Sequence, residues 1–136
     1  MGVPQISVFV ENKKGRIAQV IGILGDAGFS IRGFSVADVS DYGIVRLLVD
    51  RGTEARRLLE EAGFTTVSTE VVSVLLDDRP GALGAVLRVL AEAGFDAEYM
   101  YLTAQSSVVV KVDEIEEVER VLREKGFSVL GAESID

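Results

Sequence analysis

The sequence contains no cysteine and no histidine among its 136 residues. The chain therefore has no thiolate nucleophile, no imidazole base and no Ser-His-Asp triad, and it cannot form a zinc site from nitrogen or sulfur ligands. Carboxylates and lysines remain, but no pair of them has a spacing typical of catalysis. The sequence favours a protein that is not an enzyme and that needs neither a metal nor a cofactor.

Positive charge is scarce, and so are long apolar runs. The chain has 14 Lys and Arg against 22 Asp and Glu, a net charge of −8, whereas nucleic-acid binding needs clustered Lys and Arg to contact phosphates. No run approaches the roughly 18 apolar residues that indicate a membrane helix. The N-terminus lacks the basic and apolar regions of a signal peptide. We expect a cytoplasmic protein that binds neither nucleic acid nor membranes.

The sequence does contain an internal repeat. The segment that begins at Ile6 recurs from Val72, and Gly15 matches Gly81 at the same offset. Two copies are too few for a solenoid and indicate two copies of one small domain. A domain of this size is marginal by itself, so the copies are expected to stabilise each other. The predicted domains are residues 1–70 and 71–136.

Each copy has the same predicted order of elements. Alternating apolar residues indicate a first strand, and the i, i+3, i+4, i+7 stripe from Ile17 to Leu24 indicates a helix with one buried face. Gly28 and Gly94 are suited to end the first helices, and Thr53 and Asp113 are suited to cap the second ones. The order βαββαβ, found twice, predicts an α+β fold of two ferredoxin-like units. Beyond the first strand and helix, we expect strands at 30–37, 44–49 and 66–70 and a helix at 53–62, and in the second copy strands at 96–103, 107–112 and 128–130 and a helix at 113–125.

The loop after the first strand of each copy carries the strongest local signal, at residues 11–17 and 77–83. Gly15 and Gly81 allow the backbone to approach a ligand closely. The helix that follows offers unpaired N–H groups and the positive end of its dipole to a carboxylate. The same glycine is also what a tight turn between a strand and a helix needs. The loop by itself leaves both interpretations open.

The second copy resembles the ACT domain family. It has the sequence Asp78-Arg79-Pro80-Gly81-Ala82-Leu83, followed by Gly94, in a βαββαβ frame. The first copy has the same frame with Lys14 in place of the proline, and it is also similar to the small regulatory subunits of acetolactate synthase. Taken as a whole, the chain most resembles stand-alone tandem ACT proteins.

This resemblance implies how the copies assemble and what they bind. ACT domains pair side by side into a continuous antiparallel sheet with helices on one face. They bind an amino acid between the loop of one copy and the second strand of the other. Several members have Asn at the start of that strand, where this chain has Ser30 and Asp96, so the identity of the ligand does not carry over. By resemblance the ligand-binding residues are Asn12, Lys14, Gly15, Arg16, Ile17, Arg32, Asp38, Asp78, Pro80, Gly81, Ala82, Leu83, Glu98 and Tyr99.

Some of these residues have a second interpretation. Tyr99 and Tyr101 share one face of a strand, and for both we favour core packing or a dimer contact over ligand contact. Asp38 and Asp41 could accept an α-ammonium group or simply form a turn. Because Arg32 in the first copy corresponds to Glu98 in the second, the two sites need not be equivalent.

Two hypotheses follow for the function. The first is a non-catalytic, homodimeric sensor that binds a free amino acid at the interface between ACT copies. The second is a regulatory or interaction subunit of an amino-acid biosynthetic enzyme, similar to that of acetolactate synthase, in which the small-molecule site is vestigial. A screen of the amino acids for ligand stabilisation separates the two.

Overall fold

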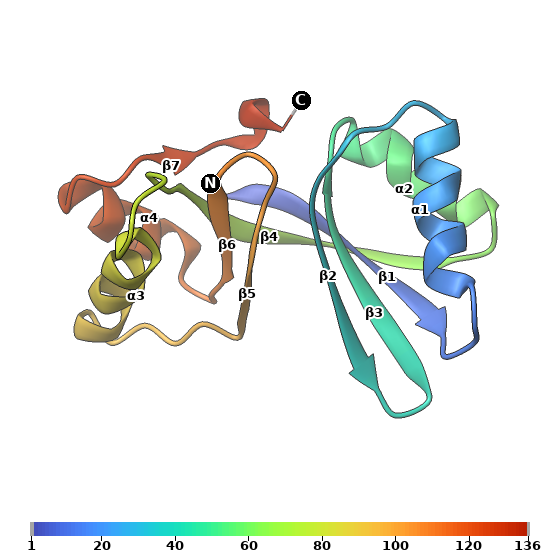
Figure 1. Ribbon diagram of the computed structural model, residues 1–136, viewed down its shortest axis with the longest axis horizontal. Coiled ribbons are helices and arrows are strands. Elements are labelled where there is room, and N and C mark those ends of the chain that lie inside the picture. The colour runs from blue at the N-terminus through green and yellow to red at the C-terminus, as the bar shows by residue number, and fades with distance from the viewer. Residues whose placement is uncertain (1, 136) are drawn as a thin grey trace. The chain divides into compact units, whose positions relative to one another are not determined.

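The computed structural model describes residues 2–135, and these contain seven strands and four α-helices (Figure 1). One short 3-10 turn, 132–134, follows the last strand. The first repeat consists of β1 (Val3–Glu11), α1 (Arg16–Asp26), β2 (Ile31–Val39), β3 (Tyr42–Val49), α2 (Gly52–Glu61) and β4 (Thr65–Leu75). The second continues with α3 (Ala82–Glu92), β5 (Tyr99–Leu102), β6 (Ser107–Lys111), α4 (Ile115–Glu124) and β7 (Val129–Leu130).

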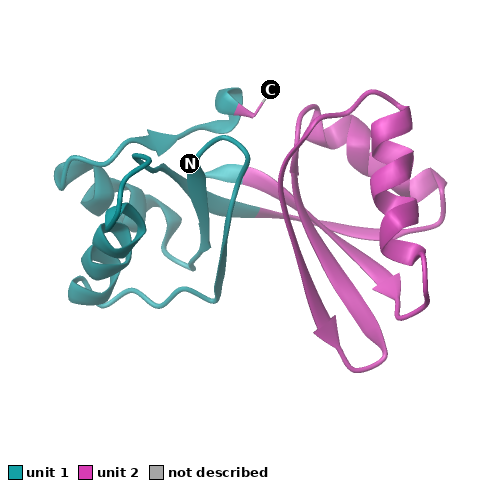
Figure 2. Ribbon diagram, viewed as in Figure 1, with its two compact units in different colours: residues 1–3, 70–134 teal, residues 4–69, 135–136 magenta. Residues whose placement is uncertain are grey.

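The chain divides into two compact units, coloured separately in Figure 2. We call residues 4–69 with Ile135 the N-terminal unit, and residues 2–3 with 70–134 the C-terminal unit. The domain boundaries that the repeat predicts, 1–70 and 71–136, stay a prediction.

The two units have the same strand order. In the N-terminal unit the order is β2-β3-β1-β4, and in the C-terminal unit it is β5-β6-β4-β7. The pairings are antiparallel, with Ile6 opposite Leu47 in one unit and Val72 opposite Val110 in the other. β4 is both the last strand of the first repeat and the first strand of the second. The predicted α+β fold with two βαββαβ repeats is confirmed.

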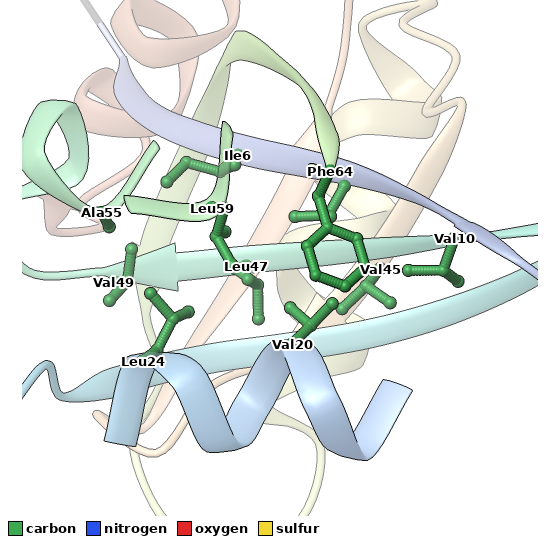
Figure 3. Packing of buried hydrophobic residues seen from close by; sticks show 11 residues of the cluster. Ile6, Val10, Val20, Leu24, Val45, Leu47, Val49, Ala55, Leu59 and Phe64 are labelled. Carbon is green, nitrogen blue, oxygen red and sulfur yellow. The ribbon is translucent and has the colours of Figure 1, made fainter. Parts of the chain in front are cut away.

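Both helices of each unit cover one face of its strands. In the N-terminal unit, Val20 and Leu24 of α1 and Leu59 of α2 are fully buried against β1 and β3. Figure 3 shows Val20 and Leu24 turned from α1 toward Val45 and Leu47. Since these helical residues recur every three or four positions, they form the single buried face that their spacing predicts. The corresponding cluster in the C-terminal unit contains Val72, Val74, Val86, Leu90, Val108, Val110, Val112, Val118 and Leu122.

The predicted helix caps are wrong. Among the described residues no side chain caps α2 or α4, and the N-cap positions are Arg51 and Glu114. Thr53 lies within α2, and the carboxylate of Asp113 instead forms an ion pair with Lys111, with Nζ and Oδ1 3.4 Å apart.

One predicted strand also needs correction. The strand expected at 96–103 is only four residues long, Tyr99–Leu102, because residues 96–98 are irregular. The strand expected at 66–70 runs directly into the first strand of the second copy, as the unbroken apolar pattern of that segment indicates, and the two form the single strand Thr65–Leu75. The predicted left-handed glycines at the ends of α1 and α3 are confirmed, with φ of 85° at Gly28 and 81° at Gly94.

Candidate ligand-binding site

The loop from β4 to α3 is built from two tight backbone turns. The N–H of Arg79 donates to the carbonyl oxygen of Asp77 at 2.9 Å, and the N–H of Ala82 donates to that of Arg79 at 3.3 Å. Gly81 is the N-cap of α3 and has a φ of 88°, a left-handed conformation that glycine adopts without steric cost. A Cβ at Gly81 would meet no described atom within 4 Å. The glycine is therefore required by the turn and also leaves open space beside the helix end.

The first turn of α3 has free backbone donors. The helix is 11 residues long, and no side chain in the described part of the chain caps it. Its amide groups at Leu83 and Gly84 donate to no carbonyl of residues 2–135. Free N–H groups together with the positive end of a helix dipole form an arrangement that binds anions such as carboxylates.

A cleft of about 90 Å³ lies beside this helix end. This is several times the roughly 10–15 Å³ that one water molecule needs. Phe127 is among its lining residues, and Asp77 and Arg79 contribute charges, with Arg79 Nε 3.4 Å from Asp77 Oδ2. Both charged side chains are exposed. The cleft, which we call the α3 cleft, is lined by Leu75, Leu76, Asp77, Arg79, Ala82, Gly126, Phe127 and Ser128.

The loop of the first repeat has the same backbone and different side chains. Gly15 also has a φ of 88° and is the N-cap of α1. The guanidinium of Arg16, the first residue of α1, lies 4.7 Å from the centre of the Phe64 ring. Its Nη1 donates to Gln19 Oε1 at 2.7 Å, and its Nη2 lies 3.8 Å from Glu11 Oε1. The Arg16 side chain is thus held against its own repeat.

Glu11 carries a stable negative charge in this loop. A hydrogen bond from Lys13 and the positive charge of Lys13 lower the pKa of the Glu11 carboxyl from its usual value of 4.5, and Arg16 lowers it further. Lys13 Nζ and Glu11 Oε2 are 3.0 Å apart. The carboxylate is therefore ionised at neutral pH and attracts both cations.

The structure brings the predicted loop residues together at the two helix N-termini. Asn12, Lys14 and Gly15 are exposed in the first loop, as are Asp78, Pro80 and Gly81 in the second. Ile17 packs against the core of the N-terminal unit, Ala82 is 8% exposed, and Leu83 is 37% exposed.

Arg32 and Glu98 do not lie beside the loop of their own repeat. Arg32 is next to Ile31, which pairs with Val49 at the far end of the strands, and its Nε donates to the Ile135 carbonyl oxygen at 3.2 Å. Glu98 Oε2 forms an ion pair with Lys111 Nζ at 3.5 Å.

Asp38 and Tyr99 complete the predicted set. Asp38 pairs with Gly43 near the loop, where the N–H of Asn12 donates to the Asp41 carbonyl oxygen at 3.3 Å. Tyr99 is half-buried on β5.

Sequence reasoning missed most of the α3 cleft. Of its lining residues, Ala82 is the one in the predicted ligand-binding set, while Asp77 and Arg79 lie in the predicted loop 77–83. Gly126 and Phe127, at the end of α4, repeat the Gly63 and Phe64 that end α2. The pair recurs because each glycine ends a helix in a left-handed conformation and each phenylalanine packs against the core of its unit.

Within the range 2–135, no group of three or more Asp and Glu side chains is arranged to hold a metal ion. None of the helices described is both long enough and apolar enough to span a membrane.

The fold is that of a regulatory domain. The family model of the ACT domain pair matches residues 1–135, and the chain belongs to this family. ACT domains are regulatory and not catalytic. The chain is 32% identical to protein BT0572 from Bacteroides thetaiotaomicron, with a TM-score of 0.90 over 99% of this chain and 96% of that one.

More distant structures share the fold. The regulatory subunit of aspartate kinase from Thermus thermophilus, in a ligand-free form, is 17% identical, with a TM-score of 0.66 over 93% of this chain and 94% of that one. The aspartokinase alpha and beta subunits are 22% identical, with a TM-score of 0.60 over 89% and 90%. The comparison with curated proteins gave no match.

Proposed function

We propose that the protein is a cytoplasmic, non-catalytic regulator that binds a free amino acid at the N-terminus of α3. The observation that carries this proposal is the pair of free amide groups, Leu83 and Gly84, beside a cleft whose lining includes Asp77 and Phe127. An amino acid has the matching groups. Its α-carboxylate is an acceptor for the amides, and its α-ammonium is a partner for Asp77.

The remaining part of the ligand would contact the apolar wall of the cleft. Phe127 and Leu76 offer that wall, and Ala82 occupies little space beside it. Polar groups that fix a ligand and apolar groups that bury it are the usual composition of a small-molecule site. The amides and Asp77 would recognise any amino acid, so the wall would select the side chain.

We also propose that another ACT copy completes the site. Arg32, Asp38, Glu98 and Tyr99 lie on or next to the second strand of their repeats. A strand from another copy, in this chain or in a second chain, would then contact a ligand whose carboxylate is held by the loop. A ligand that touches two copies favours the arrangement in which both reach it, and this preference is what could be transmitted to a partner.

A thermal-shift screen of the twenty amino acids tests the proposal. A ligand at 100 times its dissociation constant stabilises the folded state by about 2.7 kcal/mol, which corresponds to a rise of roughly 10 °C in Tm for a chain of this length. Gly81→Ala should weaken the effect at least about tenfold in ligand concentration, because its methyl group stands at the helix end.

Gly94→Ala is the matched control. Gly94 is at the other end of α3, has a similar φ of 81°, and likewise has open space where a Cβ would stand. Both variants carry a strain of about 1–2 kcal/mol, but only one changes the binding loop. Equal ligand stabilisation in the two folded variants would exclude the loop as the binding element.

The second candidate is an interaction subunit of an amino-acid biosynthetic enzyme, with a vestigial ligand site. It is favoured by apolar side chains exposed at matching positions of the two repeats, Phe34 and Val36 on β2 and Met100 and Leu102 on β5. Large exposed apolar residues that cluster indicate protein contacts. If no amino acid stabilises the chain while these residues govern its association, this candidate replaces the first.

A further inference from the structure

At one matching position beside the loop, the two repeats have side chains of very different size and charge. Ala82 begins α3, and the matching residue at the start of α1 is Arg16. The neighbours of this position are similar in both repeats, since the aromatic ring is Phe127 or Phe64 and the carboxylate is Asp77 or Glu11. A methyl group at this position of the C-terminal repeat is therefore a long cationic side chain in the N-terminal repeat.

Arg16 lies among the residues that correspond to the lining of the α3 cleft. Its guanidinium covers the Phe64 ring at 4.7 Å and lies 3.8 Å from Glu11. Its hydrogen bond to Gln19 is short, at 2.7 Å. Its Nε is buried and has no hydrogen-bond partner within residues 2–135. The N-terminal repeat thus places its own cation where the C-terminal repeat has open volume.

We infer that the chain binds one amino acid, in the C-terminal repeat, and that Arg16 is a built-in occupant of the matching cleft in the N-terminal repeat. This inference rests on the proposed function. A ligand entering the first cleft would have to displace the guanidinium from Phe64, Glu11 and Gln19. At the matching position of the C-terminal repeat, Ala82 carries a single methyl group, and the lining cation, Arg79, is an exposed side chain paired with Asp77.

The inference can be tested by NMR with each of the twenty amino acids as the probe, added singly to the ¹⁵N-labelled full chain. The amides of Gly81, Leu83 and Gly84 report on the second loop, and those of Gly15 and Ile17 report on the first. We expect one or more amino acids to shift the second set in a saturable manner and to leave the first set unchanged.

Three variants change the size or charge of the side chain at position 16 or 82. Arg16→Ala should make Gly15 and Ile17 respond, with an affinity within about tenfold of that at the other loop. Arg16→Met is the matched control, since it keeps the length of the side chain and removes its charge. In this variant the amide signals of Gly15 and Ile17 should not shift. Ala82→Met should weaken binding at the second loop by about tenfold or more. A dispersed spectrum shows that each variant is folded.

The outcomes separate the inference from the function on which it rests. If both loops of the natural chain respond, or the first alone does, the inference is wrong and amino-acid binding stands. An equal response in Arg16→Met and Arg16→Ala also overturns it, because charge and not filling would then be the cause. If binding is lost in Arg16→Ala, Arg16 is a ligand contact and the inference fails. If no amino acid shifts either loop, both proposals fall.

Discussion

The guanidinium of Arg51 lies 4.2 Å from the centre of the Phe29 ring, and its Nη2 donates to the carbonyl oxygen of Gly28 at 3.0 Å. Gly28 and Phe29 follow the end of α1, and Arg51 is the N-cap of α2. The Arg51 side chain therefore connects the C-terminal end of α1 to the N-terminal end of α2 through these two contacts. Arg51 does this from a left-handed backbone conformation, with a φ of 48°.

Replacing Arg51 should separate the effect of its side-chain contacts from the effect of its left-handed backbone conformation. Arg51→Ala should lower the free energy of unfolding by about 1 kcal/mol, because it removes a partly exposed cation–π contact and a hydrogen bond. Arg51→Gly loses the same contacts but relieves about 1 kcal/mol of backbone strain, so it should be the less destabilised variant. Urea unfolding measures both, and an Arg51→Gly variant less stable than Arg51→Ala would contradict the account.

The Glu11 carboxyl should titrate below free glutamate. Its pKa is lowered mainly by the hydrogen bond and charge of Lys13. A group with a lowered folded-state pKa stabilises the fold above its unfolded value and loses that contribution as pH falls through the folded value. The contribution is therefore present at neutral pH, begins to decline near pH 4.5 and is lost as the pH falls through the lower folded-state pKa.

The titration of Glu11 can be followed by NMR of its side-chain carboxyl. Lys13→Ala should raise the pKa toward 4.5, whereas Lys14→Ala, a change of the same charge at the adjacent exposed position, should move it much less. If the two variants give equal pKa values, the specific pair with Lys13 is not the cause.

Leu59 and Leu122 are matching core residues of α2 and α4, and both are fully buried. Truncation of either to alanine should cost about 2–5 kcal/mol of unfolding free energy, because it removes apolar contacts and leaves a cavity. Val67→Ala, at an exposed position of β4, should cost less than about 1 kcal/mol. Urea denaturation followed by circular dichroism gives the three values, and a loss below about 1 kcal/mol at either leucine would show that its core is loosely packed.

The edge strands β2 and β5 should form a homodimer contact. Leu102, 60% exposed, pairs with Val108, and Val36, 40% exposed, pairs with Val45, so both lie on the same face as core residues that the helices cover. Edge strands with apolar side chains are prone to pair with another copy. We expect light scattering at micromolar concentration to give twice the 14.6 kDa mass of the chain.

Charged substitutions test this contact. Val36→Glu together with Leu102→Glu should give a monomer, because a dimer would bury the new charges. Val67→Glu, at an exposed position on β4, should leave the dimer intact. A monomeric natural chain, with and without amino acids, would rule out the dimer.

Helices and strands could be predicted where they depend on residues that are close together in the sequence. The stripe from Ile17 to Leu24 specifies which face of α1 is buried, and Gly28 specifies where the helix ends, since both depend on a few neighbouring residues. The caps were misplaced because α2 begins at Gly52, before Thr53, and α4 begins only at Ile115, while Asp113 pairs with Lys111 at the end of β6. The short β5 was overestimated because an apolar alternation does not reveal where hydrogen-bond partners end.

The candidate site was only partly predictable. Gly81 and its loop were found because a left-handed glycine before a helix is a sequence signal. Phe127 was not, because it joins Leu76 and Ala82 only when α4 and β7 have folded against β4. The direction of the Arg16 side chain, toward Phe64 and not toward solvent, depends likewise on a residue far away in the sequence.

The residues at both ends of the chain determine which fragments of this protein contain a complete compact unit. Val3 is fully buried in the C-terminal unit, and the N–H of Gly2 donates there to the Glu119 carboxylate at 3.1 Å. Ile135, also buried, belongs to the N-terminal unit. If the chain were expressed as residues 1–70 and 71–136, the first fragment would lack Ile135 and the second would lack residues 2–3. Fragments that respected the compact units would have to carry those residues from the opposite end of the chain.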